Sequence, residues 1–249
     1  MQKTIKALTL GITLSLGVSL VFASDEPTSI IDKQTAGSLP KGTYSVNARL
    51  FGNGGLQNEI KVGITNRLMI GIGYGASGII GRENIDWFNL PGAFISYRLF
   101  EENKAFPAFS LGFNSQGYGA YNDDLERFEV KSMGFYAAAS KNYFFLGNLG
   151  LHAGANLSLE NKDEDKGINF FGGFDKSLNN ELTILAEYDF GLNDNKTKDG
   201  NYLNAGLKWD LGNSFQIEFF LKDILKNGGE LNKDEMVREI RLTFYNSYN

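Results

Sequence analysis

His152 is the only histidine of the chain, and it is the strongest candidate for a catalytic base. Asn156 and Ser158 follow in the same alternating segment, so on a strand all three side chains would point to one face. Nucleophilic catalysis requires a serine hydroxyl within about 3 Å of the histidine. Residues six positions apart on a strand are about 20 Å apart, so Ser158 cannot reach His152. A serine from a neighbouring strand remains an open alternative. We expect a non-catalytic histidine that hydrogen-bonds its neighbours.

Oxygen ligands for a metal occur in two acidic stretches. Asp163, Glu164 and Asp165 lie between two lysines, and the segment 193–195 reads Asn-Asp-Asn. Calcium accepts such oxygen ligands, but neither spacing matches a known calcium loop. The chain also has no cysteine, which excludes thiolate metal sites and disulfides. We expect solvated loops here, and neither a metal nor a cofactor.

Charged side chains of both signs recur on the more polar face of the alternating segments. Mixed charges of this kind are expected to pair across a narrow barrel lumen, which would fill it with water and ion pairs. An occluded barrel is therefore favoured over an open general porin, although a narrow passage remains an alternative. The residues expected to face the lumen are Arg49, Glu59, Lys61, Arg98, His152, Asn156, Glu187, Asp189, Lys208, Asp210, Glu218, Lys222, Glu239 and Arg241.

The elements that must carry these side chains are strands. From Thr43 to Tyr245, apolar and polar residues alternate in about twelve segments, and alternation at this period indicates half-buried strands. Short connectors such as 65–67 alternate with longer polar ones such as 77–91, which is typical of tight periplasmic turns and longer external loops. We expect an all-β fold over residues 42–249, a single closed antiparallel up-and-down transmembrane β-barrel. An exported β-sandwich is the alternative.

The first residues form a secretory signal. Lys3 and Lys6 precede an uncharged, mostly apolar stretch, and Val21-Phe22-Ala23 is a small-x-small cleavage site. We expect a signal peptide over residues 1–23 that is cleaved between Ala23 and Ser24. Residues 24–41 are polar and contain two prolines, which predicts a flexible periplasmic leader. Whether this leader enters the barrel is left open.

Two segments resemble a known family. Gly112–Gly119 and Gly134–Tyr143 are similar to the YjbH-type outer-membrane barrels linked to exopolysaccharide production. The resemblance implies a barrel in the outer membrane of a Gram-negative-type bacterium. It brings no catalytic residues with it.

These observations lead to an expected function and to expected partners. We expect a non-enzymatic barrel that acts in envelope assembly or polysaccharide export, or as a scaffold. A small diffusion channel or transporter is the alternative, and an outer-membrane phospholipase-like enzyme is less favoured. The expected partners are outer-membrane lipid, the barrel-insertion machinery, and exopolysaccharide or an export partner. A net charge of −5 makes nucleic acid a poor partner.

Overall fold

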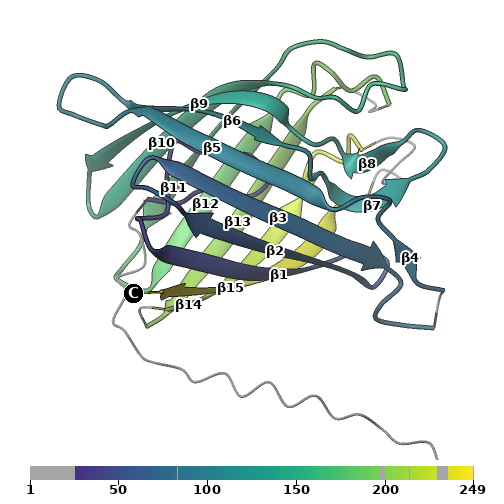
Figure 1. Ribbon diagram of the computed structural model, residues 1–249, viewed down its shortest axis with the longest axis horizontal. Helices are drawn as coiled ribbons and strands as arrows, with labels where there is room; N and C mark the ends of the chain where they lie inside the picture. The colour runs from purple at the N-terminus through teal and green to yellow at the C-terminus, as the bar shows by residue number, and fades with distance from the viewer. Residues whose placement is uncertain (1–25, 83, 197–199, 213, 229–234, 249) are drawn as a thin grey trace, which may run out of the picture.

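The computed structural model describes residues 26–82, 84–196, 200–212, 214–228 and 235–248 (Figure 1). The expected signal peptide and its Ala23–Ser24 junction lie outside these residues. No helix within the described ranges is long and apolar enough to cross a membrane.

Twelve strands pair in an antiparallel ring, which confirms the expected barrel. Eleven pairings join neighbours in the order β2-β1-β15-β14-β13-β12-β11-β10-β9-β6-β5-β3, and the pairing of β2 with β3 closes the ring. The barrel strands are β1 (Thr43–Phe51), β2 (Gly55–Gly63), β3 (Leu68–Ser77), β5 (Gly92–Phe100), β6 (Ala108–Asn114), β9 (Gly134–Phe144), β10 (Asn148–Leu157), β11 (Asn169–Ser177), β12 (Leu182–Asp189), β13 (Tyr202–Leu211), β14 (Phe215–Lys222) and β15 (Val237–Ser247).

Alternation along each strand separates an apolar outer surface from a buried inner one. Strand β2 shows the pattern clearly, since Gln57, Glu59 and Lys61 are buried while Ile60 between them is exposed. Ile72, in the middle of β3, is 55% exposed and belongs to the same outer surface. A surface of this kind, with large apolar side chains outside and charges inside, is what a lipid bilayer requires of a barrel.

The two ends of the barrel differ in the length of their connections. Strands β1 and β15 place the start and the end of the barrel at one end, which carries the short turns and is the periplasmic one (Figure 1). The opposite end carries the longer loops and three additional short strands. These are β4 (Asp86–Trp87), which pairs with the end of β3, and β7 (Tyr118–Asn122) and β8 (Arg127–Val130), which form a hairpin. The connection between β6 and β9 thus contains its own two-stranded sheet.

Candidate functional site in the barrel lumen

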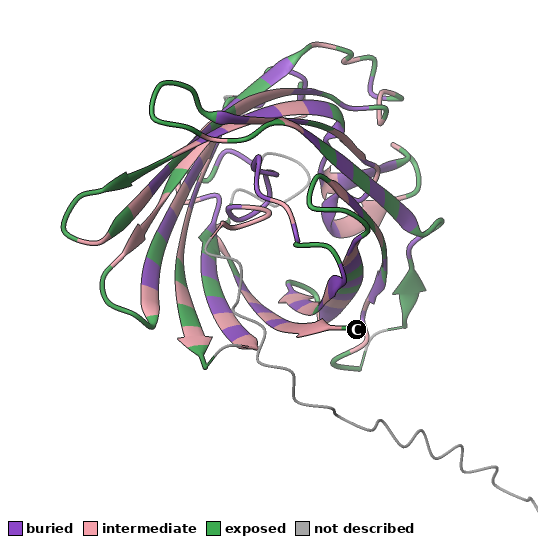
Figure 2. Cartoon of the chain, turned by 60° about the vertical axis from the view of Figure 1, so that its left-hand side comes forward, coloured by how far each residue is buried: buried purple, intermediate pink, exposed green. Residues whose placement is uncertain are grey.

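Residues 26–39, which we call the plug, lie inside the barrel (Figure 2). Residues 30–36 are at most 3% exposed. The plug folds into a small hairpin in which the Ile30 N–H donates to the Lys33 carbonyl at 2.9 Å, and the Thr35 N–H donates to the Thr28 carbonyl at 3.1 Å. The sequence predicted a flexible periplasmic leader, whereas the structure places this segment in the lumen.

Apolar contacts explain part of this placement. Ile30 and Ile31 pack against Leu185 of β12 and Phe220 of β14, which are inward-facing apolar residues among otherwise polar neighbours. Leu39 packs in a second cluster, whose other members are Met69, Phe94, Met133, Tyr136, Ala138 and Phe171. Removing these side chains from water stabilises the plug, and the barrel wall supplies the apolar surface for it.

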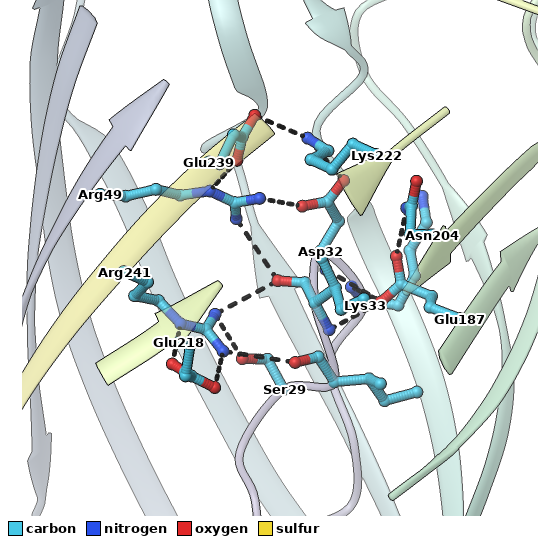
Figure 3. A network of polar contacts seen from close by, with 12 residues as sticks. Ser29, Asp32, Lys33, Arg49, Glu187, Asn204, Glu218, Lys222, Glu239 and Arg241 are labelled. Carbon is cyan, nitrogen blue, oxygen red and sulfur yellow. Dashed lines mark hydrogen bonds and ion pairs between the residues drawn. The ribbon is translucent and has the colours of Figure 1, made fainter. Parts of the chain in front are cut away.

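Glu187 of β12 binds the tip of the plug hairpin. Its Oε2 accepts the backbone N–H groups of Ile31, Asp32 and Lys33 at 3.0, 2.9 and 2.8 Å, while Oε1 accepts the side-chain amide of Asn204 at 3.0 Å (Figure 3). A buried carboxylate needs several donors to offset its lost hydration. Here the plug supplies three of these donors.

Two arginines on neighbouring strands bind the opposite side of the hairpin. Arg49 of β1 and Arg241 of β15 are direct cross-strand partners, an arrangement that is unfavourable for two like charges unless both are neutralised. Arg241 pairs with Glu218 at 2.5 and 2.8 Å, and Arg49 pairs with Glu239 at 2.5 Å. The plug adds oxygen acceptors, because both arginines donate to the Ile31 carbonyl, at 3.3 and 3.2 Å (Figure 3).

The plug also contributes charges of its own to this network. The Asp32 carboxylate lies 2.6 Å from an Arg49 nitrogen and 2.9 Å from the Lys222 ammonium (Figure 3). The Lys33 ammonium lies 2.5 Å from Asp189. Burial alone would raise the pKa of Asp32, but the attraction of Lys222 and Arg49 outweighs burial and holds the pKa well below its usual range. The plug is therefore held by paired charges as well as by apolar contacts.

The remaining length of the plug is bound closer to the periplasmic end. Arg98 of β5 donates to the Ala36 carbonyl at 2.9 Å and also pairs with Glu26 and Glu101. The Ser110 hydroxyl donates to the same carbonyl at 3.2 Å. Through these contacts the barrel wall holds the plug along its length and not only at its tip.

His152 lies in a chain of hydrogen bonds that also ends at the plug. Its Nδ1 lies 2.8 Å from the Ser140 hydroxyl, its Nε2 lies 2.7 Å from Asp175, and Ser140 accepts the Ala36 N–H at 2.9 Å. Ser140 comes from β9 and Asp175 from β11, so the structure brings together three residues that the sequence could not connect. The Ser140 oxygen is buried against the plug, which blocks access of a substrate to the hydroxyl. Asn156 lies elsewhere and donates to the Met133 carbonyl at 3.0 Å.

The outer end of the lumen is covered by the β7–β8 hairpin. Tyr118 stacks over the guanidinium of Arg49, with the Arg49 carbon 4.2 Å from the ring centre. At the far end of the hairpin, the fully buried Arg127 binds Asp163 and Asp194 at 2.9 and 2.7 Å. This network connects the hairpin to the loops after β10 and β12.

The acidic loops considered for a metal are engaged in this network. Asp163 also accepts the Lys131 ammonium at 2.7 Å. Within the part of the chain that the structure describes, no group of three or more potential ligands could hold a metal ion. These carboxylates therefore neutralise buried cations.

The other residues expected in the lumen pair locally. Lys61 and Glu59 lie 2.8 Å apart on β2. Lys208 and Asp210 lie 3.8 Å apart on β13, partly exposed at the periplasmic mouth. Sequence reasoning missed the plug residues, together with Ser140, Asp175 and Arg127. Ser140 of β9 and Asp175 of β11 were not among the residues expected in the lumen, and alternation within one strand gives no distance to the next.

Comparison with known proteins identifies the fold and no sequence family. No protein-family model matches the chain, and no curated protein matches it. Among solved structures, a KdgM porin is similar with a TM-score of 0.50 and 11% identity, covering 83% of this chain and 99% of the porin. The KdgM porin in complex with disordered oligogalacturonate gives 0.50 at 10% identity over the same shares. A NanC porin gives 0.46 at 10% identity over 83% of this chain and 100% of its own.

The expected membership of the YjbH-type family is wrong, because the structural neighbours are small outer-membrane porins. The short glycine- and aromatic-rich segments that suggested it belong to β6, the start of β7 and β9, and contribute side chains to both faces of the barrel wall. Gly112, for example, faces the Tyr136 ring so closely that a Cβ would lie 2.4 Å from it. The closed ring, the apolar outer surface and the porin-like fold show a barrel of the outer membrane of a Gram-negative-type bacterium.

Proposed function

We propose that this protein is a small diffusion channel whose lumen is closed, in the conformation described here, by its own N-terminal plug. The proposal rests on which part of the chain fills the lumen. The lumen is filled by a separate terminal segment, whereas the strands themselves contribute polar side chains that leave room for it. In eight-stranded barrels the side chains of the wall fill the interior, and larger barrels leave space.

Polar groups without partners support an interior that takes up water. Gln34 of the plug is fully buried, and neither its amide oxygen nor its amide nitrogen has a hydrogen-bond partner in the described structure. The side-chain oxygen of Gln57, in the barrel wall, is also buried without a hydrogen-bond partner in the described structure. Buried amides of this kind are normally satisfied by ordered water. A lumen that already requires water is suited to small hydrophilic solutes.

This proposal replaces envelope assembly and export scaffolding as the favoured function. The porin-like fold supports a channel, and one of the similar structures is a KdgM porin in complex with disordered oligogalacturonate. The proposal assigns no reaction to the hydrogen-bonded group of Ser140, His152 and Asp175, whose serine is occupied by the plug.

Single-channel recording in planar bilayers tests the proposal. The full chain should show rare openings. Two variants should show steady steps of single-channel current. One lacks residues 26–39, and the other also has the β7–β8 segment 118–130 replaced by a short turn. A boiled-versus-unboiled shift in electrophoretic mobility verifies that each variant is a closed barrel. If both variants are folded by this criterion and neither conducts, the channel proposal is refuted.

A further inference from the structure

A pocket of about 330 Å³ opens at the periplasmic mouth of the barrel. It is lined by the ends of β9, β10, β11, β12, β13 and β14 and by the turn after β11. Its volume is at the small end of the range of about 300–1,000 Å³ found for ligand pockets. The pocket is therefore large enough for one or two sugar rings.

The aromatic side chain of Phe144 lies at the rim of this pocket and is largely exposed. It pairs with Asn148 on the neighbouring strand and belongs to the same inward-facing row of β9 as Ser140. The residue is nonetheless 85% exposed, and its ring makes no contact with another aromatic ring among the described residues. An inward-facing ring left in water at a pocket mouth is suited to stack against the apolar face of a ligand.

The rest of the lining is rich in groups that both donate and accept hydrogen bonds. The side-chain amides of Asn148, Asn180 and Gln216 and the hydroxyl of Thr183 line the pocket. None of these four side chains has a hydrogen bond to another described residue. Amides can bind the adjacent hydroxyls of a sugar, because each amide offers both a donor and an acceptor.

The charges of the pocket restrict the kind of ligand. Asp175 and Asp210 contribute two carboxylates, against one ammonium from Lys208. This balance disfavours an anionic ligand. A flat aromatic ring, several amides and a small excess of negative charge together fit an uncharged polyol.

We propose that the periplasmic pocket binds a neutral saccharide of one or two hexose units, which stacks on Phe144 and is hydrogen-bonded by Asn180 and Gln216. The inference deepens the proposed function, because the pocket would be a solute site at the inner mouth of the channel. Binding itself does not require that the lumen conducts.

The test is binding of maltose to the purified full-length barrel, measured by saturation-transfer NMR and calorimetry. The detergent must have no sugar headgroup. Phe144→Leu should weaken binding about tenfold, the size expected for loss of one aromatic contact. Asn180→Ala should also weaken it, and both residues are exposed enough for the barrel to fold without them. The matched control is Phe145→Leu, since Phe145 is 64% exposed but is not part of the pocket lining.

Galacturonate and spermidine provide the anionic and cationic comparisons. Tighter binding of either than of maltose would overturn the assignment to a neutral sugar. Absence of maltose binding, or equal loss in the Phe144 and Phe145 variants, would overturn the site. Conductance recordings on the two unplugged variants separate the two proposals. If the full-length barrel binds maltose at Phe144 while neither unplugged variant conducts, the channel is refuted and the site is kept.

Discussion

Replacing Glu187 by glutamine should loosen the plug without changing the shape of the residue. Oε2 of Glu187 accepts three backbone N–H groups of the plug at 2.8–3.0 Å. Hydrogen bonds to a charged acceptor contribute about 1.5–3 kcal/mol and those to a neutral one about 0.5–1.5 kcal/mol. The three bonds share one oxygen and do not add fully, so we expect a loss of about 2 kcal/mol, which corresponds to a roughly 30-fold larger fraction of plug-out molecules.

A single cysteine in the plug can report this fraction, because the natural chain has none. Gln34 is the position of choice, since its side chain is fully buried and its amide makes no hydrogen bond in the described structure. In a Gln34→Cys background, the rate of maleimide labelling measures how often the plug leaves the lumen. Glu187→Gln should raise this rate roughly 30-fold.

The control is Glu126→Gln, which removes a carboxylate from an exposed pair with Lys162 in the outer loops. Electrophoretic heat-modifiability verifies that both variants are closed barrels. If labelling in Glu187→Gln stays within about threefold of the control, the plug is not held by this carboxylate and the free-energy reasoning is refuted.

Three further outcomes are expected. Lys222 and Arg49 hold the pKa of Asp32 below its ordinary value of 3.8, so its contribution to plug binding is complete above that pH and is lost only as the pH falls below it. The labelling rate of the plug reporter, divided by that of a free thiol at the same pH because the thiolate is the reactive form, should therefore be flat from pH 8 to pH 5 and rise below pH 4. A rise of this ratio already at pH 6 would contradict the reasoning. Burial raises the pKa of Glu160 from 4.5 to about 7, so ionisation of this group lowers barrel stability as the pH rises from 4.5 to 7. Glu160→Gln should therefore flatten this part of the profile of melting temperature against pH. An unchanged slope would show that Glu160 is not the titrating group. Ile72→Arg places a charge on the outer surface at mid-strand and should cost about 2–4 kcal/mol of folding free energy in bilayers, measured by urea titration, whereas no loss would mean that this face does not meet lipid.

The strands and their inner faces were predictable because they follow a local rule. In β2, every second residue from Gln57 to Lys61 is buried, and alternation alone gives that result. The position of the turns followed from the same pattern, since short and long polar segments interrupt it in turn. Such signals depend only on neighbours in sequence.

The plug was not predictable because its stability comes from distant partners. Residues 24–41 show no strand period, and their two prolines and mixed polarity resemble an ordinary linker. Inward-facing apolar residues such as Leu185 and Phe220 were an available signal, since apolar residues on a charged inner face indicate that something covers them. Likewise, alternation places His152 on the inner face, but only the strand register brings Ser140 and Asp175 within 2.8 Å of it.

The long sequence separation of the plug contacts has a consequence for the order of assembly. The plug is the first part of the described chain, yet it is held by β12, β14 and β15 through contacts between residues 154 to 212 positions apart. Bringing such distant residues together is entropically costly until the intervening strands are in place. Lodging of the plug is therefore a late event. Its full binding free energy becomes available only when β15 reaches β1 and Arg241 meets the Ile30 and Ile31 carbonyls, so the plug stabilises the β1–β15 pairing that closes the barrel.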